Sequence, residues 1–404
     1  MFSPRSHGTY LLALIGWLGI SIMITTCSLG SQDGSINPAT NCNDIAILLP
    51  ATGQESGRWE EKDYPKIERG IIEAIPEVTI RHFNANSKST KQLEQAELAL
   101  AQGSCILVVT PVDSTEASDV VNAAEKKGVP VIAYDRFIDN DNLSFYVTFD
   151  SKKVGEAQAE YAIAQIQQGD AGKYKLGNEV NLVMINGDRK DGNTQKIALG
   201  WLSTLTSEIN RNNGANINFI FPRIDENKDN LESNETAKKL EFIGEDVEQS
   251  FMEGWSGAEA AKKVKELLNK NIHIILVAND GMANDIIASL GDRKGKILVT
   301  GQDGSAQSAR LIVQGYQAMT LYKPIEETAK KTVDAIIALR NGDNLSILAN
   351  GNEMTQNSVP IPSLLLDPTP VTIDNLEQTL IADGLLTLET LCTNLPPGQG
   401  GICP

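Results

Sequence analysis

Short apolar segments alternate with amphipathic stretches along most of the chain. The apolar segments are rich in Ile and Val, and several are apolar throughout, which is typical of parallel strands buried on both faces. They are Ile45–Leu49, Val78–Phe83, Ile106–Thr110, Pro130–Tyr134, Asn181–Ile185, Ile217–Phe221, Ile272–Ala278 and Ile297–Thr300. This alternation predicts an α/β fold built from open, doubly wound parallel sheets.

The stretches between these segments have the signals of amphipathic helices. Leu93, Ala96 and Leu100 fall on one helical face. Ser256, with Glu259 three residues later, forms a capping box that predicts a helix start. The expected strands fall into two groups, before about residue 146 and after about residue 180, which favours two Rossmann-like domains facing each other across a cleft. Within the second group, after Ile217–Phe221, residues 222–250 form an acidic stretch that we interpret as a surface insertion.

The N-terminus has the pattern of an export signal. Arg5 and His7 precede an uninterrupted apolar stretch over residues 11–24. This stretch is short for a membrane-spanning helix, which needs roughly 20 residues. We therefore expect residues 1–26 to be a signal peptide and the folded part to be exported.

Cys27 follows the apolar stretch and is expected to be lipidated, as in bacterial lipoproteins. Thr26 departs from the small residue usual before such a cysteine, so an uncleaved anchor or a cut elsewhere stays the alternative. A polar stretch over residues 27–43 predicts a flexible tether. The expected location is periplasmic or cell-surface, with the chain anchored to the membrane through the lipid.

Composition and charge narrow the function. The 404 residues suffice for two cores, and the 41% hydrophobic and 22% charged residues are ordinary for a globular protein. The formal net charge of −17 repels phosphate backbones and argues against nucleic-acid binding.

Four cysteines beyond the expected lipid site favour disulfides, since the chain is expected outside the cytoplasm. Cys42 and Cys105 each open an apolar segment expected to be a strand, so a bridge between the two is plausible. Cys392 and Cys403 would then close the C-terminal tail. Metal binding is the weaker alternative because the sequence has no CxxC and only three His residues, so no metal is expected.

Polar and aromatic side chains follow the expected strands of both groups, where open α/β sheets bind ligands. They are Arg58, Trp59, Asp135, Arg136, Asp188, Asp191, Asn193, Trp255, Asn279, Asp280, Gln302 and Asp303. Planar hydrogen-bonding groups suit sugar hydroxyls, and an indole face packs on the apolar C–H face of a sugar ring. The set predicts a sugar-binding site.

Each of these residues also has a structural explanation. Asp280 and Asp303 precede helical stretches and would serve as N-caps. Asp135 and Arg136 would form a hinge ion pair with each other. Both Trp residues would be part of the core. Taken together, these explanations leave open why so many strand ends carry such groups.

The stretch Val131–Gln158 resembles the D-xylose-binding branch of the periplasmic sugar-binding proteins, which are type I periplasmic binding proteins. Six further motifs support the resemblance, which covers about residues 44–390. They are RWEEKD at 58–63, DGN at 191–193, EGW at 253–255, ANDGMA at 278–283, TGQD at 300–303 and MTLYKP at 319–324.

The resemblance implies two lobes joined by three crossing segments that form a hinge. It places residues 42–145 and 323–350 in the N-terminal lobe, and residues 146–322 and 351–404 in the C-terminal lobe. It also implies that ten residues contact the sugar, with the two Trp residues stacking on its ring. They are Arg58, Trp59, Asp135, Arg136, Asp191, Asn193, Trp255, Asn279, Asp303 and Lys323. Phe137 and Gly57 depart from the pattern of xylose binders and put the identity of the sugar in doubt, but not its class.

The implied function is a solute-binding lipoprotein of an ABC importer. It binds a monosaccharide, D-xylose or a similar aldopyranose, and delivers it to the permease as a monomer without a cofactor. An enzyme is disfavoured because the sequence has no HExxH, GxSxG or GxGxxG motif. An export signal occupies the place where a sugar-responsive repressor needs a DNA-binding module. A sensor that presents its sugar-bound form to a chemotaxis or histidine-kinase receptor stays the alternative.

Overall fold

The computed structural model describes residues 39–51, 58–176, 179–211, 216–219 and 251–404. These residues belong to one compact unit, Asn37–Pro404. The expected signal peptide, Cys27, most of the tether, Gly57 and the insertion at 222–250 lie outside the described residues. Within the described part of the chain, no helix has the length and apolar character needed to cross a membrane.

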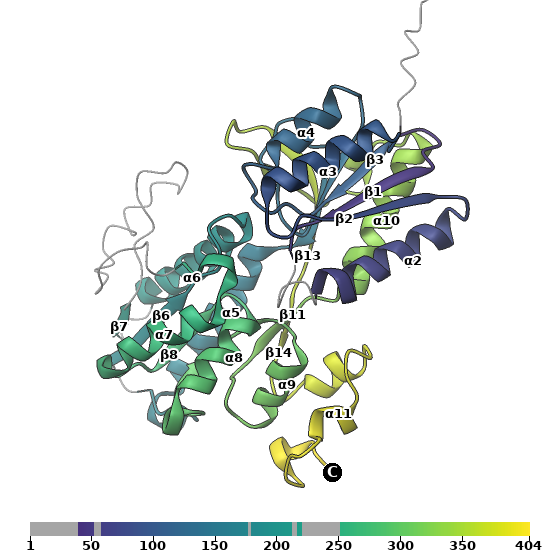
Figure 1. Cartoon of the computed structure of the whole chain (residues 1–404). Helices are drawn as coiled ribbons and strands as arrows, with labels where there is room; N and C mark the ends of the chain where they lie inside the picture. The colour runs from purple at the N-terminus through teal and green to yellow at the C-terminus, as the bar shows by residue number, and fades with distance from the viewer. Residues whose placement is uncertain (1–38, 52–57, 177–178, 212–215, 220–250) are drawn as a thin grey trace, which may run out of the picture. The chain divides into compact units, whose positions relative to one another are not determined.

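Seven strands form the first sheet, in the order β12-β13-β5-β4-β3-β1-β2. Figure 1 labels β1, β2, β3 and β13 of this sheet. All neighbours pair in parallel except β12 with β13. The strands are β1 (Asp44–Leu49), β2 (Thr79–Asn84), β3 (Ile106–Val109), β4 (Val131–Tyr134), β5 (Phe145–Phe149), β12 (Gly351–Met354) and β13 (Pro360–Leu366).

Two pairs of helices cover the two faces of this sheet. On β1, Ile45 and Ile47 point to one face and Ala46 and Leu48 to the other, as the two-residue period of a strand requires. The first face packs on α2 (Tyr64–Ala74) and α10 (Ile325–Asn341), and the second on α3 (Ser89–Ala101) and α4 (Ser118–Glu125). Burial on both faces explains why these strands are apolar throughout.

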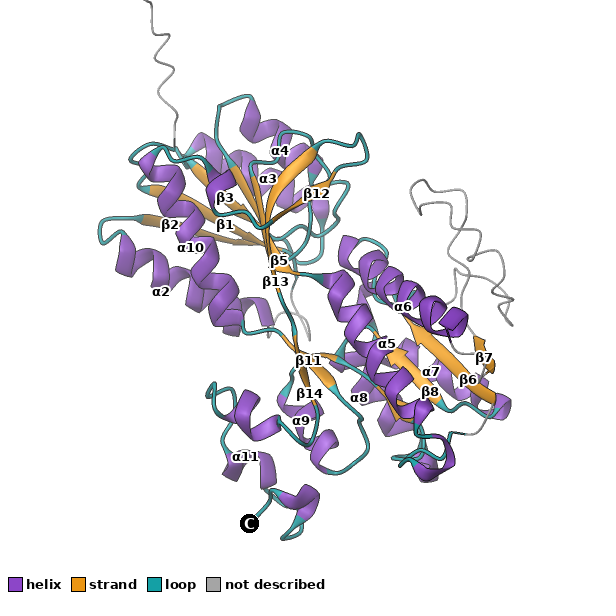
Figure 2. Ribbon diagram, turned by 180° about the vertical axis from the view of Figure 1, so that it is seen from behind, coloured by secondary structure: helices purple, strands orange, loops and turns teal. Residues whose placement is uncertain are grey.

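The second sheet has four parallel strands in the order β7-β6-β8-β9 (Figure 2). They are β6 (Glu179–Ile185), β7 (Asn216–Phe219), β8 (Ile274–Val277) and β9 (Leu298–Val299). The helices of this part are α5 (Ser151–Gln167), α6 (Gly192–Arg211), α7 (Gly257–Leu267) and α8 (Asp280–Ser289). Each of the eight expected strand segments overlaps a strand of the first or second sheet. Ser256 caps α7 as the capping box predicts, since its side chain accepts the Glu259 N–H at 3.2 Å.

Helices α5 and α6 approach each other closely because each has a glycine at the contact. A Cβ at Gly155 would lie 2.0 Å from the Ile197 carbonyl oxygen, and one at Gly200 would lie 2.2 Å from that of Lys152. No larger residue fits at either position.

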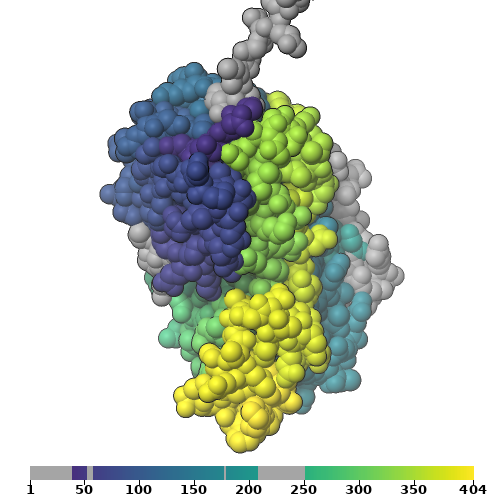
Figure 3. Space-filling model, turned by 90° about the vertical axis from the view of Figure 1, so that its right-hand side faces the viewer, coloured from purple at the N-terminus to yellow at the C-terminus, as the bar shows by residue number. Residues whose placement is uncertain are grey.

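A small third sheet and a helical tail complete the described chain. The sheet consists of β10 (Gln302–Asp303), β11 (Thr320–Tyr322) and β14 (Thr369–Val371), and α9 (Ala306–Val313) lies between β10 and β11 in sequence. The tail contains α11 (Leu388–Cys392) and shares a core with α9. Arg310 on α9 donates to the carbonyl oxygens of Leu391 (2.9 Å) and Thr393 (2.8 Å). In the space-filling view the C-terminal residues form a continuous yellow surface (Figure 3).

Both disulfides join the cysteine pairs that we expected. Cys42 bonds Cys105 at the starts of the adjacent strands β1 and β3, and Cys392 bonds Cys403 in the tail. The first bond closes a loop across 63 residues of sequence and the second a loop across 11.

The chain passes three times between the first sheet and the rest of the structure, after β5, after β11 and after β13. We expected residues 146 onward, and residues 351–404, to lie in the C-terminal lobe. The structure corrects both boundaries, because Tyr146–Phe149 pairs in register with Ser363–Leu366 inside the first sheet. Strand β12 joins the same sheet beyond β13. Only residues after β13 leave the first sheet for the tail.

Candidate functional site

Asp135 lies at the carboxyl end of β4, where it adopts a left-handed backbone conformation with φ 65°. Such a conformation costs a non-glycine residue about 1–2 kcal/mol. Several hydrogen bonds hold it in place. The Asp135 N–H donates to the Val147 carbonyl (2.8 Å), and its own carbonyl accepts from the Thr148 hydroxyl at 2.7 Å. The same carbonyl accepts from the Tyr146 hydroxyl (2.9 Å) and the Asn193 amide (3.0 Å).

The Asp135 carboxylate belongs to a set of four connected side chains. Arg58 donates from Nη2 to Asp135 and from Nε to Asp63, the latter at 3.3 Å. The Tyr134 hydroxyl donates to the other Asp63 oxygen at 2.6 Å, and both of these residues are fully buried. We call Arg58, Asp63, Tyr134 and Asp135 the Arg58 network.

Burial and charge set the protonation of this network. Burial raises the pKa of Asp63 above its ordinary value, and the charge of Arg58 opposes this. Burial acts in the same direction on Asp135, but the charges of Arg58 and Lys323 outweigh it and lower the Asp135 pKa. Asp135 is therefore ionised at neutral pH.

Trp59 lies in the core of the first sheet with 2% of its surface exposed. The guanidinium carbons of Arg58 and Arg136 lie 4.3 Å and 5.6 Å from the centre of its ring. Cations over an indole face are attracted by the ring's electron density. In this structure Trp59 therefore supports both arginines, and its implied role in stacking on a sugar stays a prediction.

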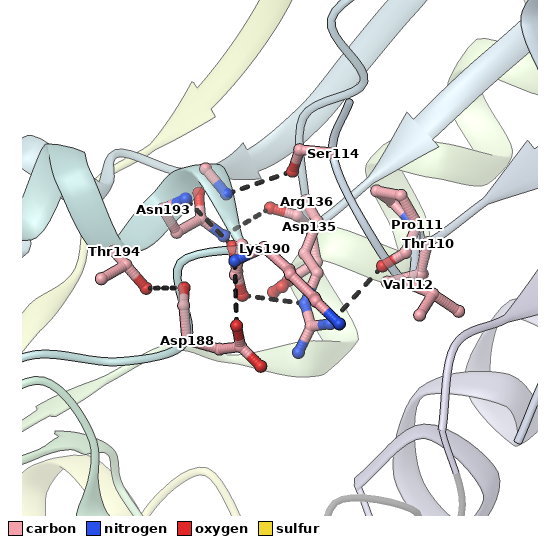
Figure 4. Close-up of polar contacts among 12 residues, drawn as sticks. Thr110, Pro111, Val112, Ser114, Asp135, Arg136, Asp188, Lys190, Asn193 and Thr194 are labelled. Carbon is pink, nitrogen blue, oxygen red and sulfur yellow. Dashed lines mark hydrogen bonds and ion pairs between the residues drawn. The ribbon is translucent and has the colours of Figure 1, made fainter. Parts of the chain in front are cut away.

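Arg136 connects the first sheet with α6. Its Nε lies 2.8 Å from Oδ2 of Asp191, and both side chains are at least 90% buried. Burial raises the pKa of Asp191, and the charge of Arg136 opposes the rise. Asp191 also accepts the backbone N–H of Asn193 at 3.0 Å, at the start of α6. Figure 4 shows Asn193 close to Asp135 and Arg136. Asp135 and Arg136 thus each pair with another residue and do not form the hinge ion pair that we considered.

Trp255 is held by the loop that carries Asp191. The Gly254 N–H donates to Asp188 at 2.7 Å, and the Asp191 N–H donates to the Asp188 carbonyl at 3.2 Å. The indole ring lies flat against Gly187, where a Cβ would be 2.3 Å from the ring. Trp255 is only partly buried, and it packs against the hydrophobic core around the second sheet. Its indole N–H has no hydrogen-bond partner among the described residues.

Asn279 lies just after β8, and Asp303 is the last residue of β10. The Asn279 side chain accepts the Met282 N–H at 2.9 Å and so caps α8. Asp303 has φ 107°, and its Oδ1 lies 3.0 Å from Nζ of Lys323 at the end of β11. We considered Asp280 and Asp303 as N-caps. This is wrong for both, because Asn279 caps α8 and Ser305 caps α9.

The strand ends thus gather seven of the ten predicted residues in one charged group. Contacts link Arg58 with Asp135, Arg136 with Asp191, and Lys323 with Asp303. Asn193 contacts the Asp135 carbonyl. Burial lowers the Arg58 pKa, but the charges of Asp135, Asp63 and, to a smaller extent, Asp303 outweigh it and raise this pKa. Trp255 joins the group through the Asp188 loop. No described contact links Asn279 or Trp59 directly with the carboxylates.

Sequence reasoning missed several partners of these residues. Asp63 lies inside the RWEEKD motif, five residues after Arg58, and Tyr146 lies on a strand that we did not predict. Lys196 on α6 contacts Glu353 on β12 at 2.8 Å and lies over the rings of Phe137 and Tyr146. Such partners belong to elements distant in sequence, so only the fold brings them together.

A model of the periplasmic binding protein domain matches residues 46–344. The D-xylose-binding periplasmic protein of Haemophilus influenzae is 29% identical over 76% of this chain and 81% of its own length. The D-xylose-binding periplasmic protein of Escherichia coli is 26% identical over 86% of this chain and 93% of its own length.

Solved structures show the same fold. A carbohydrate transporter solute-binding protein from Chloroflexus aurantiacus, in complex with D-glucose, superposes with a TM-score of 0.70. It is 24% identical, and the match covers 86% of this chain and 97% of that one. The described residues therefore adopt the type I periplasmic binding protein fold, as expected from the sequence.

Proposed function

Because the chain belongs to the periplasmic binding protein family, we propose that it binds a neutral monosaccharide, D-xylose or a similar aldopyranose, at the strand ends described above. The proposal assigns the ten residues Arg58, Trp59, Asp135, Arg136, Asp191, Asn193, Trp255, Asn279, Asp303 and Lys323 to this site. The D-xylose-binding relatives and the glucose-bound neighbour support a sugar as the ligand.

The observation that carries the proposal is the pairing of charges. Arg58, Arg136 and Lys323 each lie against a carboxylate. An anionic ligand would have to displace one of these carboxylates from its cation, and separating a buried ion pair costs several kcal/mol. A sugar hydroxyl both donates and accepts, so it can bind to the remaining N–H groups and carboxylate lone pairs of intact pairs.

In this proposal, the indole of Trp255 makes the contact that favours a cyclic sugar over a linear one. A pyranose has an apolar C–H face that packs on an indole, and the contact area is the main source of its binding energy. The Trp255 N–H adds one donor that has no partner among the described residues. A linear polyol offers no comparable face, so we propose a cyclic sugar.

Calorimetric titration tests this function. We expect one site on the order of micromolar affinity, about −8 kcal/mol, for one of xylose, glucose, galactose, arabinose and ribose. The same titration with glucuronate, which carries a carboxylate, should give no heat. Absence of heat with all five neutral sugars, in a protein whose circular dichroism shows it to be folded, would refute the monosaccharide assignment.

We further propose that the chain is an exported lipoprotein that works as a monomer, without catalysis, and hands its sugar to an ABC permease. The D-xylose-binding relatives are periplasmic proteins, which supports export. Labelling of cells with a radioactive fatty acid tests the anchor. The wild-type chain should be labelled and Cys27→Ala should not, and equal labelling of both would refute lipidation at this residue.

A further inference from the structure

One carboxyl group outside the proposed contact set ties three segments of the chain together. Asp280, the first residue of α8, has 1% of its surface exposed. Its Oδ2 accepts the Ser305 backbone N–H at 2.7 Å. Its Oδ1 accepts from the Thr320 hydroxyl (2.8 Å) and the Gln317 amide (3.1 Å). The donors lie before α9, on β11 and just before β11.

The same carboxyl group touches the chain on the other side of Asp303. A Cβ at Gly301 would lie 2.2 Å from Asp280 Oδ1, so the backbone passes directly against this oxygen. The Gly304 N–H donates to the Thr320 hydroxyl at 3.3 Å. Asp280 and its partner Thr320 therefore fix the residues on both sides of Asp303.

Asp303 needs this support because of its backbone. Its φ of 107° lies in a region that L-residues rarely adopt, which costs on the order of 1–3 kcal/mol unless the surroundings enforce it. In this conformation its carboxylate lies 3.0 Å from Lys323, which directly follows β11. The pairing of β10 with β11 sets the register of Asp303, and the Gln158 amide donates to the Gly301 carbonyl at 2.7 Å. The Asp280 contacts add the side-chain hydrogen bonds that hold the backbone next to Asp303.

We propose that Asp280 is a positioning residue, which holds the 301–305 segment and β11 so that Asp303 and Lys323 present their charged groups to the ligand. The inference rests on the proposed function only in assuming that these two groups contact a sugar. Asp280 itself does not have to touch the ligand.

The protonation of Asp280 gives this role a pH signature. Burial raises the pKa of Asp280 to about 7, and the negative charge of Asp303 adds to the rise. Asp303 on β10 is the charged group that faces it, while α9 and β11 present the neutral donors described above. All three partners donate, and a charged carboxylate accepts a hydrogen bond more strongly than a neutral carboxyl group does, so protonation weakens these contacts. Protonation should therefore loosen the 301–305 segment.

The first test needs no ligand. In the purified protein, Asp280→Asn should speed amide hydrogen exchange at Gly304 and Ser305 at least about ten-fold, because one oxygen that accepts a hydrogen bond becomes an NH2 donor. The matched control is Asp44→Asn, whose carboxylate accepts from Arg81 and Ser104 at the start of β1. It should leave exchange at Ser305 unchanged. Equal exchange in wild type and Asp280→Asn would overturn the proposal.

The second test measures sugar affinity at pH 6, 7 and 8. Wild-type affinity should weaken about ten-fold from pH 8 to pH 6, as expected for one group that titrates near pH 7. Asp280→Asn should bind at least about ten-fold more weakly than wild type at pH 8 and show no pH dependence over this range. Thr320→Val, which removes one donor and keeps the carboxyl group, should weaken binding to a smaller extent and serves if Asp280→Asn does not fold.

The outcomes separate the two claims. If wild type binds a sugar and Asp280→Asn has the same affinity and pH profile, the positioning role is refuted and the proposed function stands. If wild type binds no sugar, the proposed function fails, and the exchange rates at Gly304 and Ser305 still decide whether Asp280 holds the segment.

Discussion

The strand ends of the first and second sheets hold their polar residues in different ways. At the first sheet, the members of the Arg58 network contact one another, and Asp63 and Tyr134 are fully buried. At the second sheet, Trp255 and Asn279 are held by local contacts: Trp255 by Asp188 and Gly187, and Asn279 by its capping bond.

This difference has a physical consequence. In the Arg58 network one cation, Arg58, pairs with two buried carboxylates, Asp63 and Asp135. Removing Arg58 leaves both charges without this partner and destabilises the fold as well as the site. At the second sheet, the side chain of Trp255 or Asn279 can be replaced while the surrounding loop keeps its backbone contacts. We therefore expect substitutions at the strand ends of the first sheet to lower both stability and ligand affinity. Substitutions at the second sheet should lower affinity with little loss of stability.

The largest effect is expected for Arg58→Met. It leaves Asp63 and Asp135, whose side chains are 0% and 7% exposed, without their shared cation. We expect a loss of about 3 kcal/mol in the free energy of unfolding, together with complete loss of sugar binding. Urea denaturation and calorimetry measure the two quantities.

The matched control for this change is Arg81→Met. Arg81 is 25% exposed, as Arg58 is, but its partner Asp44 is 21% exposed and lies at the opposite end of β1. This variant should lose less stability than Arg58→Met, because an exposed ion pair contributes little, and it should bind sugar as wild type does. Equal stability losses in the two variants would contradict the special status of the Arg58 network.

The next effect is expected for Trp255→Ala. Loss of the ring face should weaken sugar binding about 30-fold, or about 2 kcal/mol, with a smaller change in the free energy of unfolding. Trp255→Phe keeps a ring and should recover most of the affinity. If Trp255→Ala binds sugar normally, the indole is not a ligand contact.

A third prediction concerns the pH dependence of stability. The pKa of Asp280 is raised to about 7, so the native state keeps a proton that the unfolded state releases near pH 4. Between these values the Asp280 contribution to the free energy of unfolding falls as pH rises, by up to about 1.4 kcal/mol per pH unit. Asp280→Asn should remove this fall when the two unfolding curves are compared from pH 4 to 8.

Asp135 should show the opposite sign. Its pKa is lowered below the ordinary value, so it contributes stability above the ordinary pKa that is lost only as pH falls through its folded-state pKa. The difference between wild type and Asp135→Asn should therefore stay constant from pH 5 to 8. A slope in this range would mean that Arg58 does not hold Asp135 ionised.

The smallest effect is expected for Asn279→Ser. Serine caps a helix about as well as asparagine, so the free energy of unfolding should change by less than about 0.5 kcal/mol. Affinity should still fall if the amide binds a sugar hydroxyl, by about five-fold. Asn279→Ala, which removes the cap as well, should lose about 1 kcal/mol of stability.

Much of the fold was readable from the apolar segments, because strands buried on both faces leave a strong pattern. Strand β5 was missed because no helix separates it from β4, although the two pair in parallel. Strand β13 pairs with β5 across more than 200 residues of sequence, and local patterns carry no sign of such a pairing. This is why the third domain boundary was misplaced.

The sequence predicts which residues belong to the site, but it does not predict which of them contact each other. The rule that ligands bind beyond strand ends, together with the motifs, selects residues such as Asp135 and Asp303. Their directions depend on positive φ angles at both positions, which a sequence does not reveal for aspartate. The pairing of Arg136 with Asp191 joins residues far apart in sequence, and Asn279 caps α8 in place of Asp280 because Asn279 is the extended residue before the helix.

The most direct test of the account is a crystal structure of the protein with the sugar that calorimetry identifies. We expect a pyranose ring packed on Trp255, with its hydroxyls bound to Arg58, Asp135, Asp191 and Asp303 while their ion pairs stay intact. A sugar bound away from these strand ends, or one that separates Arg136 from Asp191, would contradict the central claim.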